Sequence, residues 1–156
     1  GKNEIIMEFS SNSENESLAR TVISAFVARL DPTLEELADI KTAVSEAVTN
    51  AIIHGYEKNP GMVRMAAKIE DNVVSVEISD TGAGIENLEK AMEPMYTTKP
   101  QLDRSGMGFS FMEAFMDELH VVSGQGRGTS VRMRKKIGSD RAESGKACDG
   151  SCNRTD

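Results

Sequence analysis

LEELADIKTAVSEAVTNAIIHG, residues 34–55, has the spacing of one long amphipathic helix. At about 100° per residue, its larger apolar side chains fall on a single stripe, which consists of Leu37, Ile40, Val44, Val48 and Ala51. Such a stripe is typical of a helix that packs on a sheet. We therefore expect this helix to lie at the centre of the core.

The other side of the same helix carries Glu46, Asn50 and His54, which recur every four residues and therefore line up along the axis. Their neighbours Ala43 and Ala47 are small and apolar, whereas a solvated helix face usually carries more charge. One interpretation is that the three polar side chains face a cavity. The other is a polar stripe that ends in a hydrogen-bonded histidine, and the helix alone does not separate the two.

The chain of 156 residues has the length of one domain, large enough to bury roughly two thirds of its unfolded surface. Its net charge of −7 argues against direct binding to nucleic acid or to an anionic membrane, both of which need a basic surface. An anionic ligand is not excluded, because exposed charges are screened over about 8 Å at physiological salt. Local groups and a bound cation therefore decide whether phosphate binds.

Both cysteines, Cys148 and Cys152, lie in a tail rich in Gly, Ser and Asp. A structural disulfide is not expected there, and two cysteines alone make an incomplete metal site. Few apolar residues follow Ile137, so we expect residues 138–156 to be disordered. No apolar run approaches the ~20 residues of a membrane span, and the N-terminus lacks a signal pattern, which together favour a cytoplasmic protein.

Helix boundaries are indicated by capping residues. Ser13 with Glu16 predicts a capping box at the start of a first helix, and Thr33 with Glu36 predicts a second box at the start of the central helix. Gly55 is the expected C-cap of the central helix.

Strand periodicity predicts an α+β fold. Strands are expected at residues 4–9, 62–70, 73–79, 121–123 and 129–135, and further helices at 86–92 and 109–119. The intervening segment, residues 93–106, contains two prolines and no sustained periodicity, and segments of this length without regular structure are often lids or binding loops. This order favours a two-layer α/β sandwich, with helices on one face of a mixed, mostly antiparallel sheet.

The segment Asp80-Thr81-Gly82-Ala83-Gly84 ends one of the predicted strands. Two glycines at this spacing let the backbone bend sharply and approach a ligand, and the carboxylate can accept a hydrogen bond from an exocyclic amine. An ordinary turn explains the same residues, because Asp and Gly cluster in turns.

A second glycine pair, Gly106 and Gly108 around Met107, precedes the predicted helix at residue 109. Free N–H groups at a helix N-terminus bind phosphate, and Lys99, Arg104 and Ser105 add positive charge and a hydroxyl donor. A flexible hinge with solvated cations is the alternative. The pair is neither a P-loop nor a dinucleotide-binding fingerprint, which require longer motifs.

Each of these motifs is a weak signal by itself, but their order along the chain and their combination are specific. A carboxylate and an amide on one helix precede DTGAGI, TTKP, RSGMGF and a threonine on a late strand. This pattern resembles the GHKL ATP-binding family, which comprises gyrase-type ATPases, histidine kinases and bacterial serine kinases. From about Phe9 to Arg134 the chain looks like the anti-sigma-F factors of spore-forming bacteria. The resemblance implies a Bergerat ATP-binding fold and a kinase domain over residues 1–137, with an ATP lid at about 93–108.

The resemblance also implies roles for individual residues. Asn50 would ligate a Mg²⁺ ion that bridges the phosphates, and Glu46 would be the general base. Asp80 would recognise the adenine amine, with Thr129 assisting. The remaining contacts to ATP or ADP would come from Gly82, Gly84, Thr98, Lys99, Ser105, Gly106, Met107 and Gly108.

Partners are implied in the same way. Such factors are homodimers that bind a sporulation sigma factor of the sigma-F type in the ATP form and phosphorylate its anti-anti-sigma antagonist on serine. Arg20 and Arg104 match positions that contact these partners, although solvated surface arginines are the default interpretation. His54 at the helix end and His120 on a strand edge are not expected to accept phosphate. The alternatives are a nucleotide-gated sigma-binding module without transfer, and a free-standing ATPase.

Overall fold

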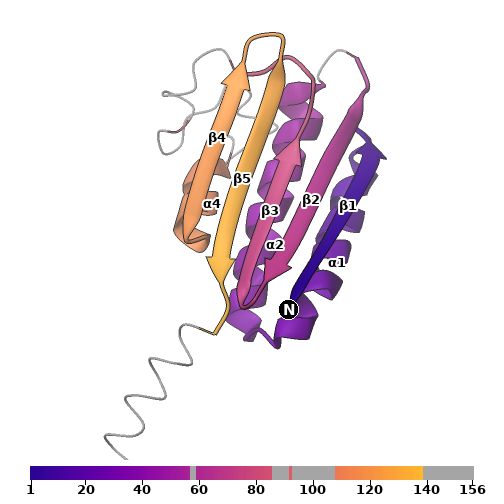
Figure 1. Ribbon diagram of the computed structural model, residues 1–156. Helices are drawn as coiled ribbons and strands as arrows, with labels where there is room; N and C mark the ends of the chain where they lie inside the picture. The colour runs from indigo at the N-terminus through magenta and orange to yellow at the C-terminus, as the bar shows by residue number, and fades with distance from the viewer. Residues whose placement is uncertain (57–58, 86–91, 93–107, 139–156) are drawn as a thin grey trace, which may run out of the picture.

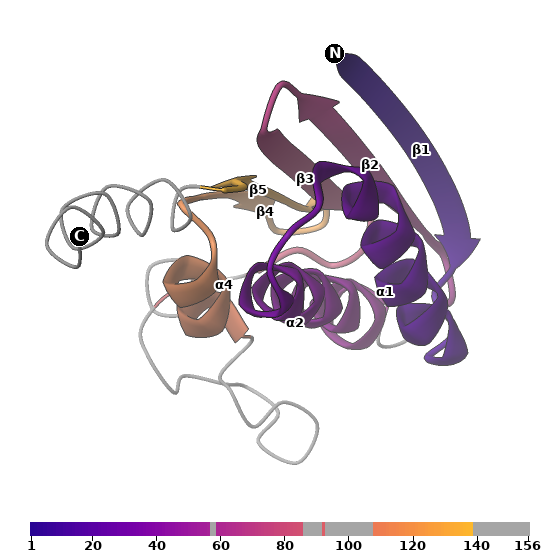
Figure 2. The same ribbon diagram turned by 90° about the horizontal axis from the view of Figure 1, so that it is seen from below.

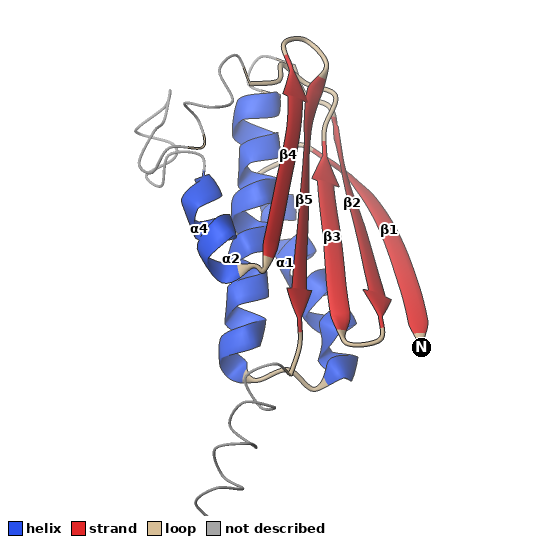
Figure 3. Cartoon of the chain, turned by 60° about the vertical axis from the view of Figure 1, so that its left-hand side comes forward, coloured by secondary structure: helices blue, strands red, loops and turns tan. Residues whose placement is uncertain are grey.

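The computed structural model describes residues 1–56, 59–85, 92 and 108–138, and the fold consists of two layers. A five-stranded sheet forms one layer, and the helices α1, α2 and α4 cover one of its faces (Figures 1 and 2). The same division into a helical and a sheet layer is visible from the side in Figure 3. The predicted α+β sandwich is confirmed.

Most of the helices and strands follow one another along the chain with short connections, whereas residues 80–108 separate β3 from α4. The elements are β1 (Lys2–Ser10), α1 (Glu14–Val27), a 3₁₀ turn (Ala28–Leu30), α2 (Leu34–Asn50), a π-helical turn (Ala51–Gly55), β2 (Met62–Glu70), β3 (Val73–Ser79), α4 (Phe109–Phe115), β4 (Glu118–Gly124) and β5 (Gly128–Lys136). The predicted short helix at 86–92 and the lid at 93–107 lie outside the described residues, apart from Met92.

The sheet has the strand order β1-β2-β3-β5-β4. Each pair of neighbouring strands in the described part of the chain is antiparallel. The sequence predicted a mostly antiparallel sheet, which is confirmed, but the sheet is not mixed. Because β5 returns beside β3, the hairpin of β4 and β5 completes the sheet at the edge opposite β1. The end of β3 and the start of β5 are thereby brought close to the end of α2 (Figure 1).

The core lies between the two layers. Ile40, Val44 and Val48 of α2 are fully buried, as the apolar stripe predicted. The facing side of the sheet supplies alternate residues such as Val74 and Val76, which are also fully buried, whereas the residues between them point away from the helices. A period-2 strand and a 3.6-period helix therefore bury their apolar faces against each other.

One of the two predicted capping boxes forms. The hydroxyl of Thr33 accepts a 3.0 Å hydrogen bond from the backbone N–H of Glu36, and the Glu36 carboxylate accepts a 2.9 Å bond from the N–H of Thr33. Ser13 makes no such bond, and the prediction there was wrong because Glu16 instead accepts from the hydroxyl of Ser45 on α2. The Glu16 carboxylate thus links two helices.

The central helix continues to Gly55 as predicted, but its last five residues form a wider π-helical turn. The predicted C-cap at Gly55 was wrong: the φ of Gly55 is not positive, so it is not a left-handed cap, and Tyr56 occupies the C-cap position. A Cβ at Gly55 would come within 2.8 Å of Asp80 Oδ1, so the residue permits close contact with the loop after β3.

Helix α4 is shorter than the predicted span of 109–119. After Phe115 the backbone becomes extended, and Asp117 joins β5 through two hydrogen bonds: its N–H donates to the Arg134 carbonyl at 2.8 Å, and its carboxylate accepts from the Lys136 N–H at 2.7 Å. Pairing with the sheet therefore outweighs helical periodicity in residues 116–119. Among the described residues, no helix is both long and apolar enough to span a lipid bilayer.

Candidate functional site

Four of the residues for which the sequence predicted a ligand contact meet at one cavity. Asn50 lies at the end of α2, Asp80 and Gly84 follow β3, and Thr129 lies at the start of β5. The other lining residues are mostly apolar, as in ligand sites where a few polar groups set orientation. They are Ala47, Ala51, His54, Gly55, Ile78, Ile85, Phe109 and Val131.

The cavity is narrow. Its free space is about 330 Å³ when its open mouth is included, but the enclosed part measures only about 10 Å³. That is about the space needed to hold a single water molecule. A planar ring can therefore enter only if the lining side chains move apart.

Asp80 is the buried acid of the cavity, with 8% of its surface exposed. Its Oδ1 accepts a 2.9 Å hydrogen bond from the N–H of Gly82, and its own N–H donates to the carbonyl of Thr129 at 2.9 Å. Burial raises the pKa of the Asp80 carboxyl above its ordinary value, and the backbone N–H groups of Gly82 and Thr129 only partly oppose this rise. The buried carboxylate can accept a hydrogen bond from a ligand N–H donor.

Asp80→Asn is expected to increase the free energy of unfolding at neutral pH. Above its native pKa, the folded protein carries the full penalty of the buried charge. That penalty disappears as the pH falls through the raised native pKa toward 3.8, the value of an exposed aspartate. In urea unfolding at pH 7, the free energy of unfolding of the asparagine variant should therefore be higher than that of the wild type. Near pH 4 this difference should disappear.

Asp71→Asn provides the control for this comparison, because the Asp71 side chain is 90% exposed. It should change the free energy of unfolding little at either pH. A lower stability of Asp80→Asn at pH 7 would show that hydrogen bonds to the charged carboxylate outweigh its burial.

The glycines beside Asp80 are required by contacts within the protein. A Cβ at Gly82 would lie 1.9 Å from the carbonyl oxygen of Gly55, and one at Gly84 would lie 2.1 Å from that of Gly124. Gly84 also has φ +76°, a conformation that other residues rarely adopt. The DTGAG segment thus packs closely between the helix end at Gly55 and the β4–β5 turn. Of these two glycines, only Gly84 lines the cavity.

Thr129 belongs to a small hydroxyl network. Its Oγ1 lies 2.7 Å from the Oγ of Ser123 on β4, and that serine accepts a 2.7 Å hydrogen bond from the N–H of Ile85. The network joins β4, β5 and the loop after β3, and two of its members, Ile85 and Thr129, line the cavity. Ser123 was not singled out in the sequence, where nothing distinguishes it from a surface serine.

Glu46 lies one helical turn before Asn50 and next to the start of α4. Gly108, the residue that precedes α4, adopts φ +74°, and a Cβ there would lie 2.3 Å from Glu46 Oε2. Glu46 also lines a surface groove of about 500 Å³ together with Arg20, Ala38, Lys41, Thr42 and Ser45. The carboxylate therefore lies beside the residue that precedes α4, and Glu46 lines an open groove.

Arg20 lies on the rim of the same groove. Its Nη1 is 3.7 Å from Oε1 of Glu16, and its side chain is 43% exposed. An ion pair this exposed contributes little to stability. Arg20 is therefore a partly exposed residue of α1, and its contact with a partner stays a prediction.

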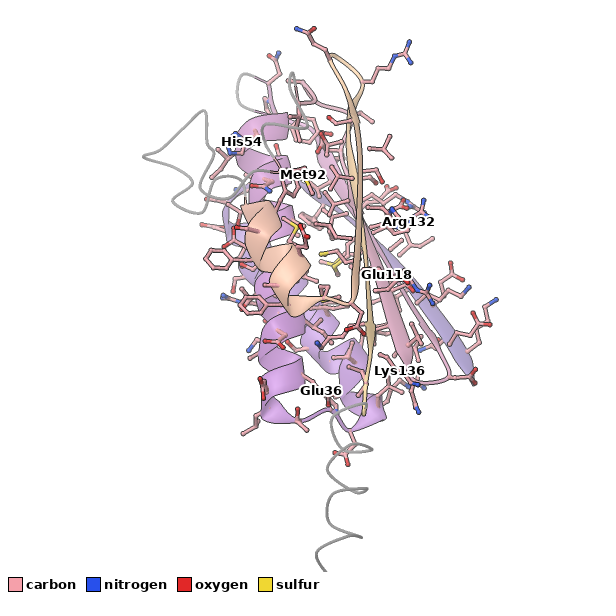
Figure 4. All side chains as sticks on the ribbon, turned by 90° about the vertical axis from the view of Figure 1, so that its left-hand side faces the viewer. Glu36, His54, Met92, Glu118, Arg132 and Lys136 are labelled. Carbon is pink, nitrogen blue, oxygen red and sulfur yellow. The ribbon has the colours of Figure 1, made fainter. Side chains whose placement is uncertain are left out.

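The two histidines occupy the positions expected of them. His54 and Met92 lie toward one end of the helical layer, and Glu36 lies toward the opposite end (Figure 4). His54 lines the cavity, and His120 is exposed on the edge strand β4. The remaining candidates fall outside the described residues: Thr98, Lys99, Arg104, Ser105, Gly106 and Met107.

The side-chain oxygen that Asn50 presents at the cavity suits a divalent cation. In the described part of the chain, no group of three or more His, Cys, Asp or Glu side chains is arranged to hold a metal ion. Asn50 contributes a neutral oxygen donor at the cavity. Mg²⁺ prefers oxygen ligands and retains several waters, so it is commonly held by one or two protein oxygens together with substrate phosphates. A site with Asn50 as the protein ligand therefore suits Mg²⁺ only when a phosphate is also bound.

A comparison with protein families matches residues 9–135 to the histidine kinase-like ATPase domain. Among curated proteins, an anti-sigma F factor of Thermoanaerobacter sp. (strain X514) is 58% identical over 135 residues, which are 86% of this chain and 94% of the relative. Those of Clostridium acetobutylicum and Geobacillus thermodenitrificans are 56% and 54% identical, and the alignments cover 95% and 97% of their lengths.

Solved structures confirm the fold alone, because their sequences are distant. The RsbU and RsbW domains of a Mycobacterium tuberculosis protein match with a TM-score of 0.62 and 20% identity, over 86% of this chain and 32% of that one. A blue-light activated histidine kinase of Erythrobacter litoralis matches with a TM-score of 0.53 and 22% identity, over 72% of this chain and 34% of that one.

The family match covers most of the chain, and curated relatives that are more than half identical align over nearly their whole length. The chain therefore belongs to the histidine kinase-like ATPase domain family and, within it, to the anti-sigma F factors.

Proposed function

We propose that this protein is an ATP-dependent serine protein kinase that also acts as an anti-sigma factor. The observation that carries the proposal is the convergence of Asn50, Asp80 and Thr129 on one cavity, with Glu46 one helical turn away. The kinase domain would comprise residues 1–137, with an ATP lid at about 93–108. The protein would act in the cytoplasm, where bacterial sigma factors act.

Adenine recognition is assigned to the buried end of the cavity. The carboxylate of Asp80 would accept a hydrogen bond from the exocyclic amine, and Thr129 would assist beside it. The apolar side chains of Ile78, Ile85 and Val131 line the same cavity and suit an aromatic ring. Gly82 and Gly84 contribute indirectly, because they allow the loop to pack as it does.

The triphosphate is assigned to the region between Asn50 and the start of α4. The side-chain oxygen of Asn50 would hold Mg²⁺, and the ion would neutralise phosphate charge in the transferring group. Lid residues would complete the phosphate contacts: Thr98, Lys99, Ser105, Gly106, Met107 and Gly108. Their roles rest on the sequence motifs.

Glu46 is assigned as the general base. Its carboxylate would take the proton from a serine hydroxyl as that oxygen forms a bond to the γ-phosphorus, while the bond to the ADP oxygen breaks. The groove beside Glu46 opens to solvent, so a protein substrate can approach from that side. Because an intact acid stands there, transfer is favoured over a binding module without chemistry.

Membership in the family supports the proposal of two protein partners. The curated relatives are named anti-sigma F factors, and we propose a sigma-F type sigma factor as the sequestered partner. The serine substrate would be the anti-anti-sigma antagonist, and Arg20 and Arg104 would contact these proteins. A homodimer is proposed for the active form.

Radiolabelled ATP with Mg²⁺ and a candidate antagonist protein tests the proposal. Label on a serine of the antagonist is the expected result. Nucleotide binding and sigma binding without labelled serine would instead support a nucleotide-gated sequestering module. Steady phosphate release in the absence of any partner would indicate a free-standing ATPase.

A further inference from the structure

Tyr56 follows the π-helical turn at the end of α2 and joins it to the loop after β3. Its hydroxyl accepts a 2.8 Å hydrogen bond from the N–H of Thr81 and donates a 2.7 Å bond to the carbonyl of Met62, the first residue of β2. The hydroxyl of Thr81 lies 3.2 Å away. One phenol thus connects three separate segments near the cavity.

The loop that Tyr56 contacts is held at each of four successive N–H groups. Asp80 donates to the Thr129 carbonyl, Gly82 to Oδ1 of Asp80, and Ala83 to the Gly55 carbonyl, each at 2.9 Å. Thr81 donates to Tyr56. Of the four acceptors, the Tyr56 hydroxyl is the one side chain that comes from outside the loop.

We infer that Tyr56 is a positioning residue for adenine recognition, an inference that rests on the proposed function. Thr81 lies between Asp80, which would accept from the adenine amine, and Gly82, which donates to that same carboxylate. The N–H of Thr81 belongs to the peptide plane that joins Asp80 to Thr81, so its hydrogen bond to Tyr56 fixes the orientation of that plane. The direction of the Asp80 carboxylate therefore depends on a hydroxyl that does not line the cavity.

The hydrogen bonds of the Tyr56 hydroxyl orient the loop after β3 more than they stabilise the fold. The bonds of the Tyr56 hydroxyl lie near the surface, where water can replace a missing partner. The ring packs closely against Gly61, where a Cβ would lie 2.3 Å from the ring, and this packing does not require the hydroxyl. Tyr56→Phe should therefore fold normally, with a thermal midpoint close to that of the wild type.

Calorimetric titration with two nucleotides tests the inference. Wild type and Tyr56→Phe are titrated, with Mg²⁺ present, with ATP and with purine riboside triphosphate, which lacks the exocyclic amine. We expect Tyr56→Phe to weaken ATP binding by roughly three- to tenfold, the worth of one hydrogen bond. Binding of the analogue should stay unchanged, because it makes no bond to the amine acceptor.

Ser11→Ala is the matched control. The Ser11 hydroxyl accepts a 3.0 Å bond from the N–H of Gly61, so the variant also removes a hydroxyl from this surface segment but does not touch the loop after β3. It should leave the affinity for both nucleotides unchanged.

The other outcomes separate the two levels of the proposal. Equal weakening of both nucleotides by Tyr56→Phe would reveal a merely structural role, and no weakening of either would show that the hydroxyl is dispensable. Each result would overturn the inference while leaving the proposed function intact. A wild type that binds no ATP, or does not distinguish it from the analogue, would overturn the adenine assignment itself.

Discussion

Glu46→Gln is expected to lower phosphoryl transfer to the antagonist by roughly 10²- to 10⁴-fold, the usual contribution of a general base. Glutamine has the same shape but cannot take the serine proton. It also retains the packing of this side chain against Gly108, where contact is close enough to exclude a Cβ. ATP affinity should therefore stay near that of the wild type. Single-turnover transfer from radiolabelled ATP, together with calorimetry, measures both quantities.

Glu35→Gln provides the control for Glu46→Gln, because it makes the same charge change on an exposed position in the first turn of α2. It should transfer phosphate at the rate of the wild type. If Glu46→Gln also transferred at that rate, Glu46 would not be the base. Loss of both transfer and ATP binding would instead assign Glu46 to the nucleotide site.

Asn50→Ala is expected to remove most of the Mg²⁺ dependence of ATP binding. The Asn50 side chain is 7% exposed and lines the cavity, and alanine provides no oxygen for the ion. Changes in the surroundings of a metal site typically cost 10- to 100-fold in affinity, so loss of the protein ligand should cost roughly 100-fold or more. Titration with ATP in Mg²⁺ and in a chelator measures the difference.

Thr49→Ala is the matched control for Asn50→Ala. Thr49 is the neighbouring residue on the same helix, but it does not line the cavity. It should bind ATP with the Mg²⁺ dependence of the wild type. If Asn50→Ala retained that dependence in full, the ion would be held elsewhere, and the proposed role of Asn50 would be wrong.

The sequence predicted the layers of the fold more accurately than the ends of its elements. Buried stripes such as Val44 and Val48, or Val74 and Val76, carry a strong periodic signal, since a one-residue shift would expose all of them. The end of α4 was missed because the pairing of Asp117 with β5 depends on residues far along the chain. The capping box at Ser13 failed for the same reason.

The sequence predicted residues that the structure brings to one cavity, such as Asn50 and Asp80, but not the contacts that hold them there. Helical spacing was enough to place Glu46 and Asn50 one turn apart, whereas the DTGAG motif indicated Asp80 only in combination with the other motifs. The partners of these residues come from elsewhere: no role was predicted for Ser123 or Tyr56, which are brought in by the sheet order and by the helix end. Local patterns do not encode such contacts, because they arise only when the chain is folded.

A crystal structure of the protein with Mg²⁺ and a non-hydrolysable ATP analogue tests the central claim most directly. The cavity should be widened by an adenine ring whose amine lies within hydrogen-bonding distance of Asp80, and a metal ion should join the side-chain oxygen of Asn50 to phosphate oxygens. Nucleotide bound elsewhere, or an Asn50 side chain with neither metal nor phosphate near it, would contradict the claim.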